Sequence, residues 1–559
     1  MNDTWHSLSP VSGEPWAFTT GPWIEEEPGV VTSPPQPADD SLAVSTAAAY
    51  RDFEAEFDFR WEIQGSDSGF VFRGRHARHY YLVHFPCTGQ QFRGAHFWAA
   101  ISKVDASGWA RVLHTQVVPG IPSEIGLWHT ARLRVQGPEI RLWVDGRAFP
   151  VVTDDTYDGA GYVGLETYNG RDPDEVKEYF GDARPRVGSG NSFRNVRIRG
   201  EAVAAPPWDS SVAPGPGWRH PLPDTTHGAY QYVGGLVRLD SGEVLLKVAA
   251  LDAHTTGTRT ILLLRSHDAG RSWSEPEVLP DTLQSAALHP VEGDNIVAFL
   301  MQHDPPFDLS IMESADAGRT WSEPTGIGCV TFDDDLDIEH AYLSKVVPLR
   351  DGTLLRFGYS VAVGPSMHGG ENRDGWRYVG APAPGSFSYC VRSTDGGRSW
   401  SQPIRVDGPN PRPGMLMNAR ETASETSACE VAPNRIVALI RPESSPWMWE
   451  MWSHDGGRSW SPATRGHFPM YACTDAMTAT ANGAMVIAGR HPGIGAQLSL
   501  DGGMSWQATR IDTPFYANGA TVEVEPDVVL YVYDGKYSDA RVRAQRLRVT
   551  PGGLEPADA

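Results

Sequence analysis

Apolar and polar residues alternate in short runs between residues 50 and 200, which is the pattern of half-buried β-strands. Clear examples are FEAEFDFRWEI (53–63), YYLVHF (80–85), ARLRVQG (131–137) and EIRLWVDG (139–146). The runs are short and closely spaced, so they predict antiparallel strands packed into a β-sandwich.

The second half of the chain repeats one eight-residue segment five times. The copies are SHDAGRSW (266–273), SADAGRTW (314–321), STDGGRSW (393–400), SHDGGRSW (453–460) and SLDGGMSW (499–506). Strand-like runs separate them at a spacing typical of four-stranded propeller blades. In each copy the Asp side chain is suited to accept amide hydrogen bonds from its own turn, and the Gly residues tolerate positive φ. We therefore expect structural turns rather than reactive groups.

A segment rich in Pro, Gly and Ser, residues 204–218, separates the two patterns and is typical of a linker. A chain of 559 residues also exceeds one ordinary core. We expect an all-β protein with a jelly-roll β-sandwich at residues 1–203, a linker at 204–218 and a β-propeller at 219–559.

Composition narrows the functional classes. A formal net charge of -22 argues against nucleic acid as a partner. No apolar run approaches the length of a membrane span, so no membrane partner is expected. The five cysteines have neither paired nor zinc-like spacing. The first residues lack the basic and apolar regions of a signal peptide, which favours a cytoplasmic protein, although a secreted mature chain would look similar.

Two resemblances to known families follow from these motifs. The stretch WHTARLRVQGPEIRLWVDGRAF (128–149) resembles the concanavalin-like, laminin-G-like jelly-roll family, whose members often bind carbohydrate; a structural or docking module is the alternative. The repeated segments fit the Asp-box pattern [ST]-x-D-x-G-x-[ST]-W, and from about residue 219 the chain resembles the sialidase (neuraminidase) superfamily. That resemblance implies a six-bladed propeller with its active site on the face opposite the repeated turns.

The sialidase resemblance implies three catalytic residues. The run SETSACEVAPNRIVALIR (424–441) resembles the family's stretch from the catalytic Glu to a carboxylate-binding Arg, implying Glu425 as the base and Arg441 as a substrate contact. The run FYANGATVEV (515–524) implies Tyr516 as the nucleophile. A phenol has a pKa of about 10, so it needs a neighbouring carboxylate to accept its proton. Asp252, the only carboxylate in residues 251–266, is the expected general acid/base.

The chain departs from the sialidase pattern at two of the three arginines that hold the substrate carboxylate. Tyr232 stands where the first Arg is expected, and Arg490 is displaced from the position of another. Loss of one buried partner of a carboxylate costs about 2–5 kcal/mol. We therefore expect a neutral sugar, a uronic acid or a related keto-sugar acid rather than ordinary sialic acid. The predicted substrate-binding residues are Arg441, Arg490, Tyr232, His254, His340, Asp475 and Trp376.

Two further segments have alternative interpretations. Trp376 lies in an insertion, residues 359–386, and is placed to stack on a sugar ring; a disordered loop or a contact with a second copy of the chain is the alternative. The acidic run FDDDLDIEH (332–340) is more typical of a solvated loop than of a metal site, so no cofactor or metal is expected, and a calcium site is the alternative.

Three functions remain open, all with carbohydrate as the partner. The first is a sialidase-like glycoside hydrolase that cleaves a terminal glycosidic bond. The second is a propeller-type polysaccharide lyase acting on uronate-containing glycans through His340, His254, Tyr516 and Arg441. The third is a glycan-binding protein without catalysis. The sequence leaves open whether the chain forms a homo-oligomer.

Overall fold

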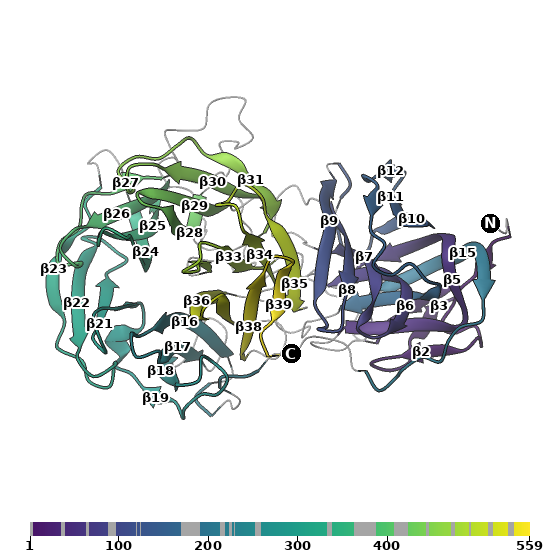
Figure 1. The fold of residues 1–559 in the computed structure, drawn as a ribbon, viewed down its shortest axis with the longest axis horizontal. Helices are drawn as coiled ribbons and strands as arrows, with labels where there is room; N and C mark the ends of the chain where they lie inside the picture. Colours follow the sequence, from purple (N-terminus) through teal and green to yellow (C-terminus); the bar gives the residue numbers. More distant parts are fainter. Residues whose placement is uncertain are drawn as a thin grey trace.

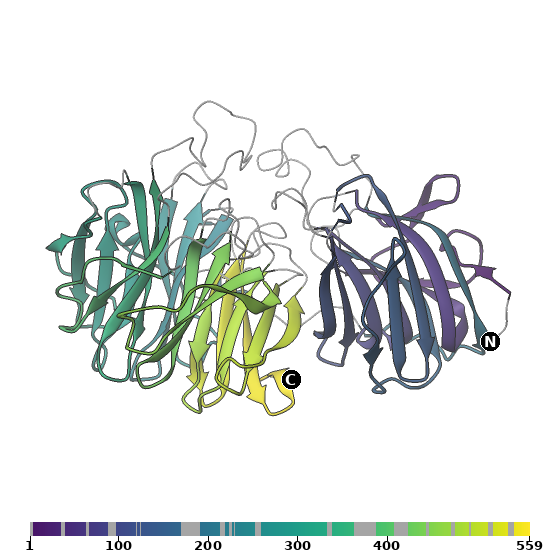
Figure 2. The same ribbon diagram turned by 90° about the horizontal axis from the view of Figure 1, so that it is seen from above.

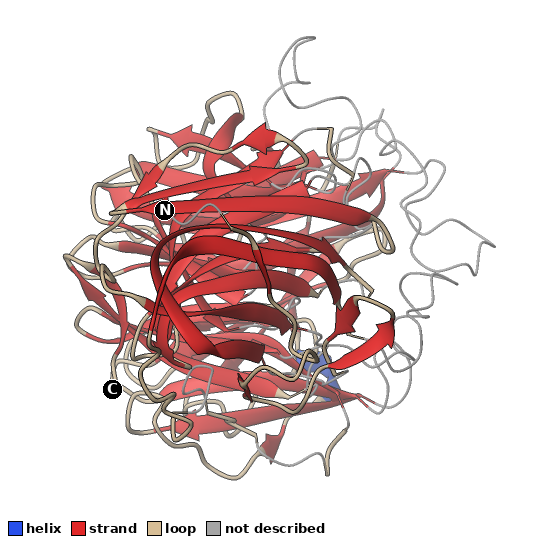
Figure 3. Ribbon diagram, turned by 90° about the vertical axis from the view of Figure 1, so that its right-hand side faces the viewer, coloured by secondary structure: helices blue, strands red, loops and turns tan. Residues whose placement is uncertain are grey.

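The structure is a computed structural model of the 559-residue chain. It describes residues 4–34, 40–62, 66–87, 97–118, 120–122, 124–168, 190–212, 219–222, 226–228, 230–251, 259–332, 338–362, 387–406, 423–442, 447–470, 476–490, 494–512, 518–534 and 541–558. Strands account for nearly all of the regular structure, as expected for an all-β protein (Figure 3). A single turn of 3-10 helix, Asp281–Leu283, is the exception within these ranges.

The N-terminal part is a β-sandwich of antiparallel strands. Its strands are β1 (His6–Ser7), β2 (Trp16–Phe18), β3 (Ile24–Glu27), β4 (Val30–Thr32), β5 (Asp40–Arg60), β6 (Asp67–His76), β7 (His79–Pro86), β8 (Phe97–Val104), β9 (Ala110–Val118), β10 (Trp128–Gln136), β11 (Glu139–Val144), β12 (Arg147–Ala148), β13 (Val152–Thr153), β14 (Gly161–Tyr168) and β15 (Ser192–Val203). The long strand β5 organises the sheet, because it pairs with β2, β10, β14 and β15.

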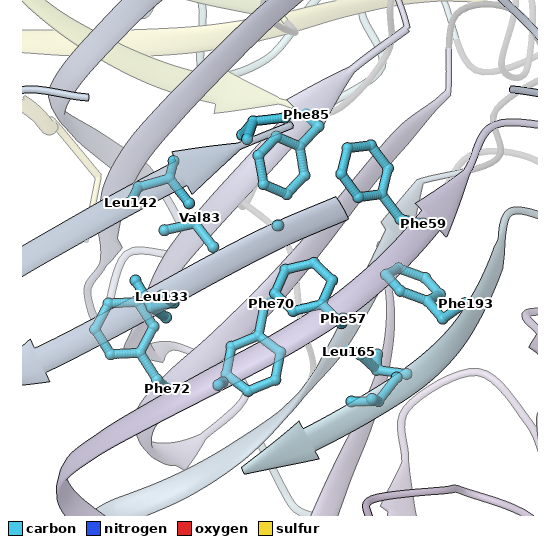
Figure 4. Packing of buried hydrophobic residues seen from close by; sticks show 14 of the residues in the cluster. Phe57, Phe59, Phe70, Phe72, Val83, Phe85, Leu133, Leu142, Leu165 and Phe193 are labelled. Carbon is cyan, nitrogen blue, oxygen red and sulfur yellow. The ribbon is translucent and has the colours of Figure 1, made fainter. Parts of the chain in front are cut away.

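Apolar and polar residues that alternate in the sequence point to opposite faces of the strands in this sandwich. In the hairpin β10–β11, for example, Leu133 lies opposite Leu142 and both side chains are fully buried. The core they join is rich in aromatic rings (Figure 4). Phe59 and Phe85 stack with ring centroids 4.3 Å apart. Stacked and tilted pairs of this kind add to the burial of apolar area, which dominates the stability of such a core.

The C-terminal part is a β-propeller built from four-stranded antiparallel meanders. Its strands are β16 (Tyr230–Arg238), β17 (Val244–Leu251), β18 (Arg259–Ser266), β19 (Glu277–Val278), β20 (Ala287–Pro290), β21 (Ile296–Met301), β22 (Asp308–Ser314), β23 (Thr325–Cys329), β24 (Ile338–Pro348), β25 (Leu354–Ala362), β26 (Phe387–Ser393), β27 (Ile404–Arg405), β28 (Ala423–Ala432), β29 (Arg435–Pro442), β30 (Trp447–Ser453), β31 (Thr464–Pro469), β32 (Met477–Ala479), β33 (Met485–Gly489), β34 (Ile494–Ser499), β35 (Gln507–Asp512), β36 (Gly519–Glu525), β37 (Val528–Asp534), β38 (Val542–Thr550) and β39 (Gly553–Pro556). Figure 1 shows the sheets arranged around a centre.

The number of separate blade sheets differs from the expected six. Within the described chain, five four-stranded sheets stand alone: β16–β19, β20–β23, β24–β27, β28–β31 and β36–β39. The meander β32–β35 is not a separate blade sheet, because β35 also pairs with β9 and so joins the sheet of the sandwich. The prediction of a six-bladed propeller is therefore wrong for the described chain, which has five separate blades, and the reason is a hydrogen-bonded junction between the two domains. Figures 1 and 2 show these domains side by side.

The five repeated turns have one hydrogen-bonding pattern and connect the third and fourth strands of their meanders. In residues 393–400, Asp395 accepts hydrogen bonds from Ser393 Oγ at 2.7 Å, from Ser399 N at 3.0 Å and from Ser399 Oγ at 2.5 Å. Trp400 packs edge-on against Phe299 of the preceding sheet, with ring centroids 5.5 Å apart. The repeats therefore close turns and fill the space between sheets, as the sequence predicts.

Candidate functional site

Strand direction sorts the side chains onto two faces of the propeller. Each repeated turn follows the third strand of its meander, so the start of the first strand and the end of the second lie at the opposite face. We call this opposite side the turn-free face. Five predicted site residues lie at or near strand ends on this face: Tyr232, His340, Glu425, Arg441 and Arg490.

Glu425 and Arg441 form a direct ion pair on the turn-free face. Glu425 lies near the start of β28 and Arg441 near the end of β29, where Thr426 is opposite Ile440 in the register. Arg441 Nη1 lies 2.7 Å from Glu425 Oε2, and the two side chains are 14% and 24% exposed. Both charges are thus partly withdrawn from water while remaining accessible. Charge-assisted pairs of this kind are among the stronger hydrogen-bonded contacts in proteins.

A second cluster lies on the neighbouring sheets of the same face. His340 Nδ1 lies 2.6 Å from Asp304 Oδ1, although 36 residues separate them in the chain. Beside this pair, Tyr342 stacks on Tyr359 with centroids 4.7 Å apart, and His303 lies 4.7 Å from the Tyr342 ring. Burial lowers the pKa of His303 below its ordinary value, which favours the neutral imidazole at neutral pH.

Arg490 has a different environment from the other predicted substrate contacts. It directly follows β33, its exposed fraction is 3%, and its Nη1 donates to Asn518 Oδ1 at 3.3 Å. Asn518 N in turn donates to Asp534 Oδ1 at 3.0 Å. The arrangement links Arg490 to the residues at the start of β36.

Tyr232 lies on another sheet of the same face. It is half-buried in β16, opposite Ala249 of β17.

The remaining predicted site residues lie outside the described part of the chain. These are Tyr516, Asp252, His254, Asp475 and Trp376. Their roles stay predictions. The structure therefore joins two members of the predicted site, Glu425 and Arg441, and places three others on the same face of different sheets.

Some polar groups on this face were not found by sequence reasoning. Asp304 lies between β21 and β22, directly before the cis Pro305–Pro306 bond, and no sequence motif marks it as a partner of His340. Asp512, Tyr533 and Arg543 form a buried network, and they too lack a local signature. Contacts between residues tens of positions apart depend on strand register, which short motifs do not encode.

The described residues contain no group of three or more His, Cys, Asp or Glu side chains placed to hold a metal ion. Most of the acidic run 332–340 lies outside them. No helix in the described ranges is long and apolar enough to cross a membrane.

A surface cavity of about 210 Å³ lies apart from the predicted site. It is lined by Asp105, Ser107, Trp109, Arg111, Thr509, Leu554, Glu555 and Pro556, none of which is a predicted site residue.

Two family models match separate parts of the chain. Residues 3–199 match the 3-keto-alpha-glucoside-1,2-lyase-like domain, and residues 296–513 match the BNR repeat-like domain. The first match falls on the β-sandwich and the second on part of the β-propeller. No curated protein matches it.

Several solved structures resemble the chain at low identity. A point mutant of the NanB sialidase from Streptococcus pneumoniae is 12% identical, with a TM-score of 0.43, over 90% of this chain and 96% of that one. The Hadza microbial sialidase Hz136 is 15% identical, with a TM-score of 0.43, over 92% and 98%. An alpha-L-arabinanase from Penicillium chrysogenum, complexed with arabinobiose, is 12% identical, with a TM-score of 0.41, over 60% and 99%.

Proposed function

We propose that this protein is a glycoside hydrolase of the sialidase-like class that cleaves the terminal glycosidic bond of an acidic or unusual sugar. The observation that carries the proposal is the 2.7 Å pair of Glu425 and Arg441 on the turn-free face. The name of the family model that matches residues 3–199 refers to a glucoside, which supports a sugar as the substrate.

In the proposed reaction, the Tyr516 oxygen attacks the anomeric carbon while Glu425 accepts the phenolic proton. Asp252 protonates the departing glycosidic oxygen, so the aglycone leaves as an alcohol. Asp252 then removes a proton from water, which attacks the anomeric carbon and breaks its bond to the Tyr516 oxygen. Glu425 returns its proton to the departing phenolate, which restores the starting state. Two displacements at one carbon retain its configuration.

Arg441 has two roles in this scheme. Its contact with Glu425 orients the carboxylate that serves as the base. A guanidinium has five N–H donors in a rigid plane, so one group is able to contact Glu425 and a substrate carboxylate together. Tyr232 replaces the arginine expected at the start of the propeller, which removes a cationic contact and disfavours ordinary sialic acid.

The test is turnover on a panel of chromogenic glycosides that includes sialosides, uronides and neutral sugars. We expect release of the chromophore from at least one terminal sugar, and strong loss of turnover in Glu425→Gln. Glu313→Gln is the matched control, because Glu313 pairs with Arg398 at 3.2 Å in an exposed ion pair on the opposite face. Equal activity of Glu425→Gln and the wild type would reject the proposed base.

A lyase acting on uronate-containing glycans is the second candidate, favoured by the 2.6 Å contact between His340 and Asp304. A histidine oriented by a carboxylate is suited to remove the proton next to a uronate carboxylate, with elimination of the glycosidic oxygen. An unsaturated product with new ultraviolet absorbance would identify this reaction. A released reducing sugar without that absorbance supports the hydrolase. Binding without either product would leave the non-catalytic glycan-binding function.

A further inference from the structure

The sandwich and the propeller share one hydrogen-bonded sheet. Strand β9 of the sandwich pairs with β35, the outer strand of the meander β32–β35 (Figure 1). In this register Arg111 lies opposite Thr509, and Ala110 lies opposite Arg510. The outer edge of this meander is therefore covered by the other domain, which removes an exposed strand edge.

The hydrophobic core is also continuous across the junction. Trp109 of the sandwich is 3% exposed and belongs to a cluster that otherwise consists of propeller residues, among them Ile511, Tyr531 and Leu547. Separation of the domains would expose this indole ring and the apolar surface that it covers. Such a contact favours fixed domains rather than independent motion.

A chain of buried hydrogen bonds starts at the same tryptophan. Trp109 Nε1 donates to Gln545 Oε1 at 3.0 Å. Gln545 Nε2 donates to Ile511 O at 2.9 Å and also lies 2.9 Å from Tyr533 Oη. Tyr533 Oη donates to Asp512 Oδ2 at 2.6 Å. The path links the surface of one domain to the last residue of β35 in the other.

Asp512 is the charged end of this path. Its Oδ2 lies 2.8 Å from Arg543 Nη1, and the two side chains are 2% and 0% exposed. Burial, reinforced by the charge of Asp512, raises the pKa of Tyr533 well above its ordinary value, so the phenol stays protonated and donates. A buried network of this kind holds its members in one arrangement because every alternative leaves a polar group unsatisfied.

A second contact between the domains lies on the neighbouring strands. Arg510 Nη1 lies 3.4 Å from Asp67 Oδ2 of β6. The same carboxylate oxygen lies 2.7 Å from His84 Nδ1, and His84 Nε2 lies 3.2 Å from Ser102 Oγ. Each of these four residues is at most 6% exposed. The junction thus contains two buried polar contacts, Trp109–Gln545 and Arg510–Asp67, and the apolar contact around Trp109.

We infer that the sandwich is a fixed part of the propeller and positions its turn-free face, with Trp109 and Gln545 as positioning residues. Asp512 immediately precedes residues 513–517, which include the predicted nucleophile Tyr516. Asn518, on the other side of that segment, is held by Asp534. The inference rests on the proposed function only where it concerns turnover; the coupling of the domains stands independently.

The coupling is tested on the full chain by calorimetry with Trp109→Phe, Gln545→Leu and the double variant. Phe keeps an aromatic ring at the junction but removes the indole N–H donor and part of the ring volume, a loss of volume that Trp143→Phe shares. We expect a single unfolding transition in every protein, a lower Tm in each single variant, and a double variant whose loss is smaller than the sum. Trp143→Phe is the control, since Trp143 contacts Arg132 within the sandwich. Two separate transitions in the wild type, or additive losses, would overturn the coupling.

The positioning role is tested by the kinetics of Trp109→Phe on the glycan that the panel identifies. We expect kcat to fall about tenfold or more with KM nearly unchanged, because small displacements of reacting groups are costly. An unchanged kcat in a protein with coupled unfolding would overturn the positioning role alone. Absence of turnover in the wild type would reject the proposed function, while the calorimetric result would still decide the coupling.

Discussion

Arg441 and Glu425 meet at the ends of two neighbouring antiparallel strands, with 2.7 Å between Nη1 and Oε2. The residues are 16 positions apart in the chain, and the hairpin β28–β29 brings them together. Since neither charge is fully buried, the pair remains accessible to a ligand.

Arg441→Ala is expected to raise KM strongly for an acidic sugar and only weakly for a neutral one. The reason is the loss of a charge-assisted contact to the substrate carboxylate, worth about 2–5 kcal/mol. Steady-state kinetics on a uronide and on the matching neutral glycoside measure the difference. Arg398→Ala serves as the control, because Arg398 is 68% exposed and lies in a repeated turn. Equal effects on both sugars would show that Arg441 does not contact a substrate carboxylate.

Tyr516→Phe is expected to abolish turnover and leave the fold intact. The variant removes the nucleophilic oxygen of the proposed mechanism and keeps the aromatic ring. Turnover is measured on the active glycoside, and circular dichroism and the thermal unfolding curve check the fold. Full activity in a correctly folded variant would show that another group attacks the sugar.

Acid is expected to destabilise the propeller between about pH 4 and pH 2 through its repeated turns. The Ser399 hydroxyl, the Ser393 hydroxyl and the Ser399 amide lower the pKa of Asp395 to about 2. A lowered pKa means that the folded state binds the proton more weakly than the unfolded chain. The carboxylate therefore contributes stability above the unfolded pKa, and this contribution is lost as the pH falls through the folded value.

Thermal unfolding of wild type and Asp395→Ala over this pH range measures the effect. The difference in Tm between the two proteins should shrink as the pH approaches 2, because the wild-type carboxylate is then protonated. A difference that is the same at pH 5 and pH 2 would show that the charge of Asp395 does not stabilise the turn.

Gly397→Ala is expected to destabilise the protein more than Gly396→Ala does. Both residues have positive φ, 86° and 72°, so alanine is strained at each by about 1–2 kcal/mol. A Cβ at Gly397 would also lie 2.3 Å from Phe299, whereas a Cβ at Gly396 meets nothing within 4 Å. Overpacking adds about 1–3 kcal/mol. Thermal and denaturant unfolding compare the variants, and equal losses would mean that Phe299 moves aside freely.

Short-range patterns were sufficient to predict the class of fold. Residue alternation in 131–137 and 139–146 predicts two half-buried strands, and the structure has β10 and β11 there, with Leu133 and Leu142 buried. The repeated turns follow from the five copies of one motif, because Asp395 and its equivalents bond only to neighbours in the chain. Such interactions are local, so the sequence alone determines them.

Tertiary structure decided how these elements combine. The structure has fewer separate blade sheets than the sequence predicts because β35 pairs with β9, about 400 residues away in the chain. No local pattern in either strand predicts this pairing. The contacts between His340 and Asp304 and between Tyr533 and Asp512 arise in the same way. The sequence by itself determined the strands, the turns and the candidate pair Glu425 and Arg441. The junction of the domains and its buried polar network depend on long-range register, which is set only when the whole chain packs.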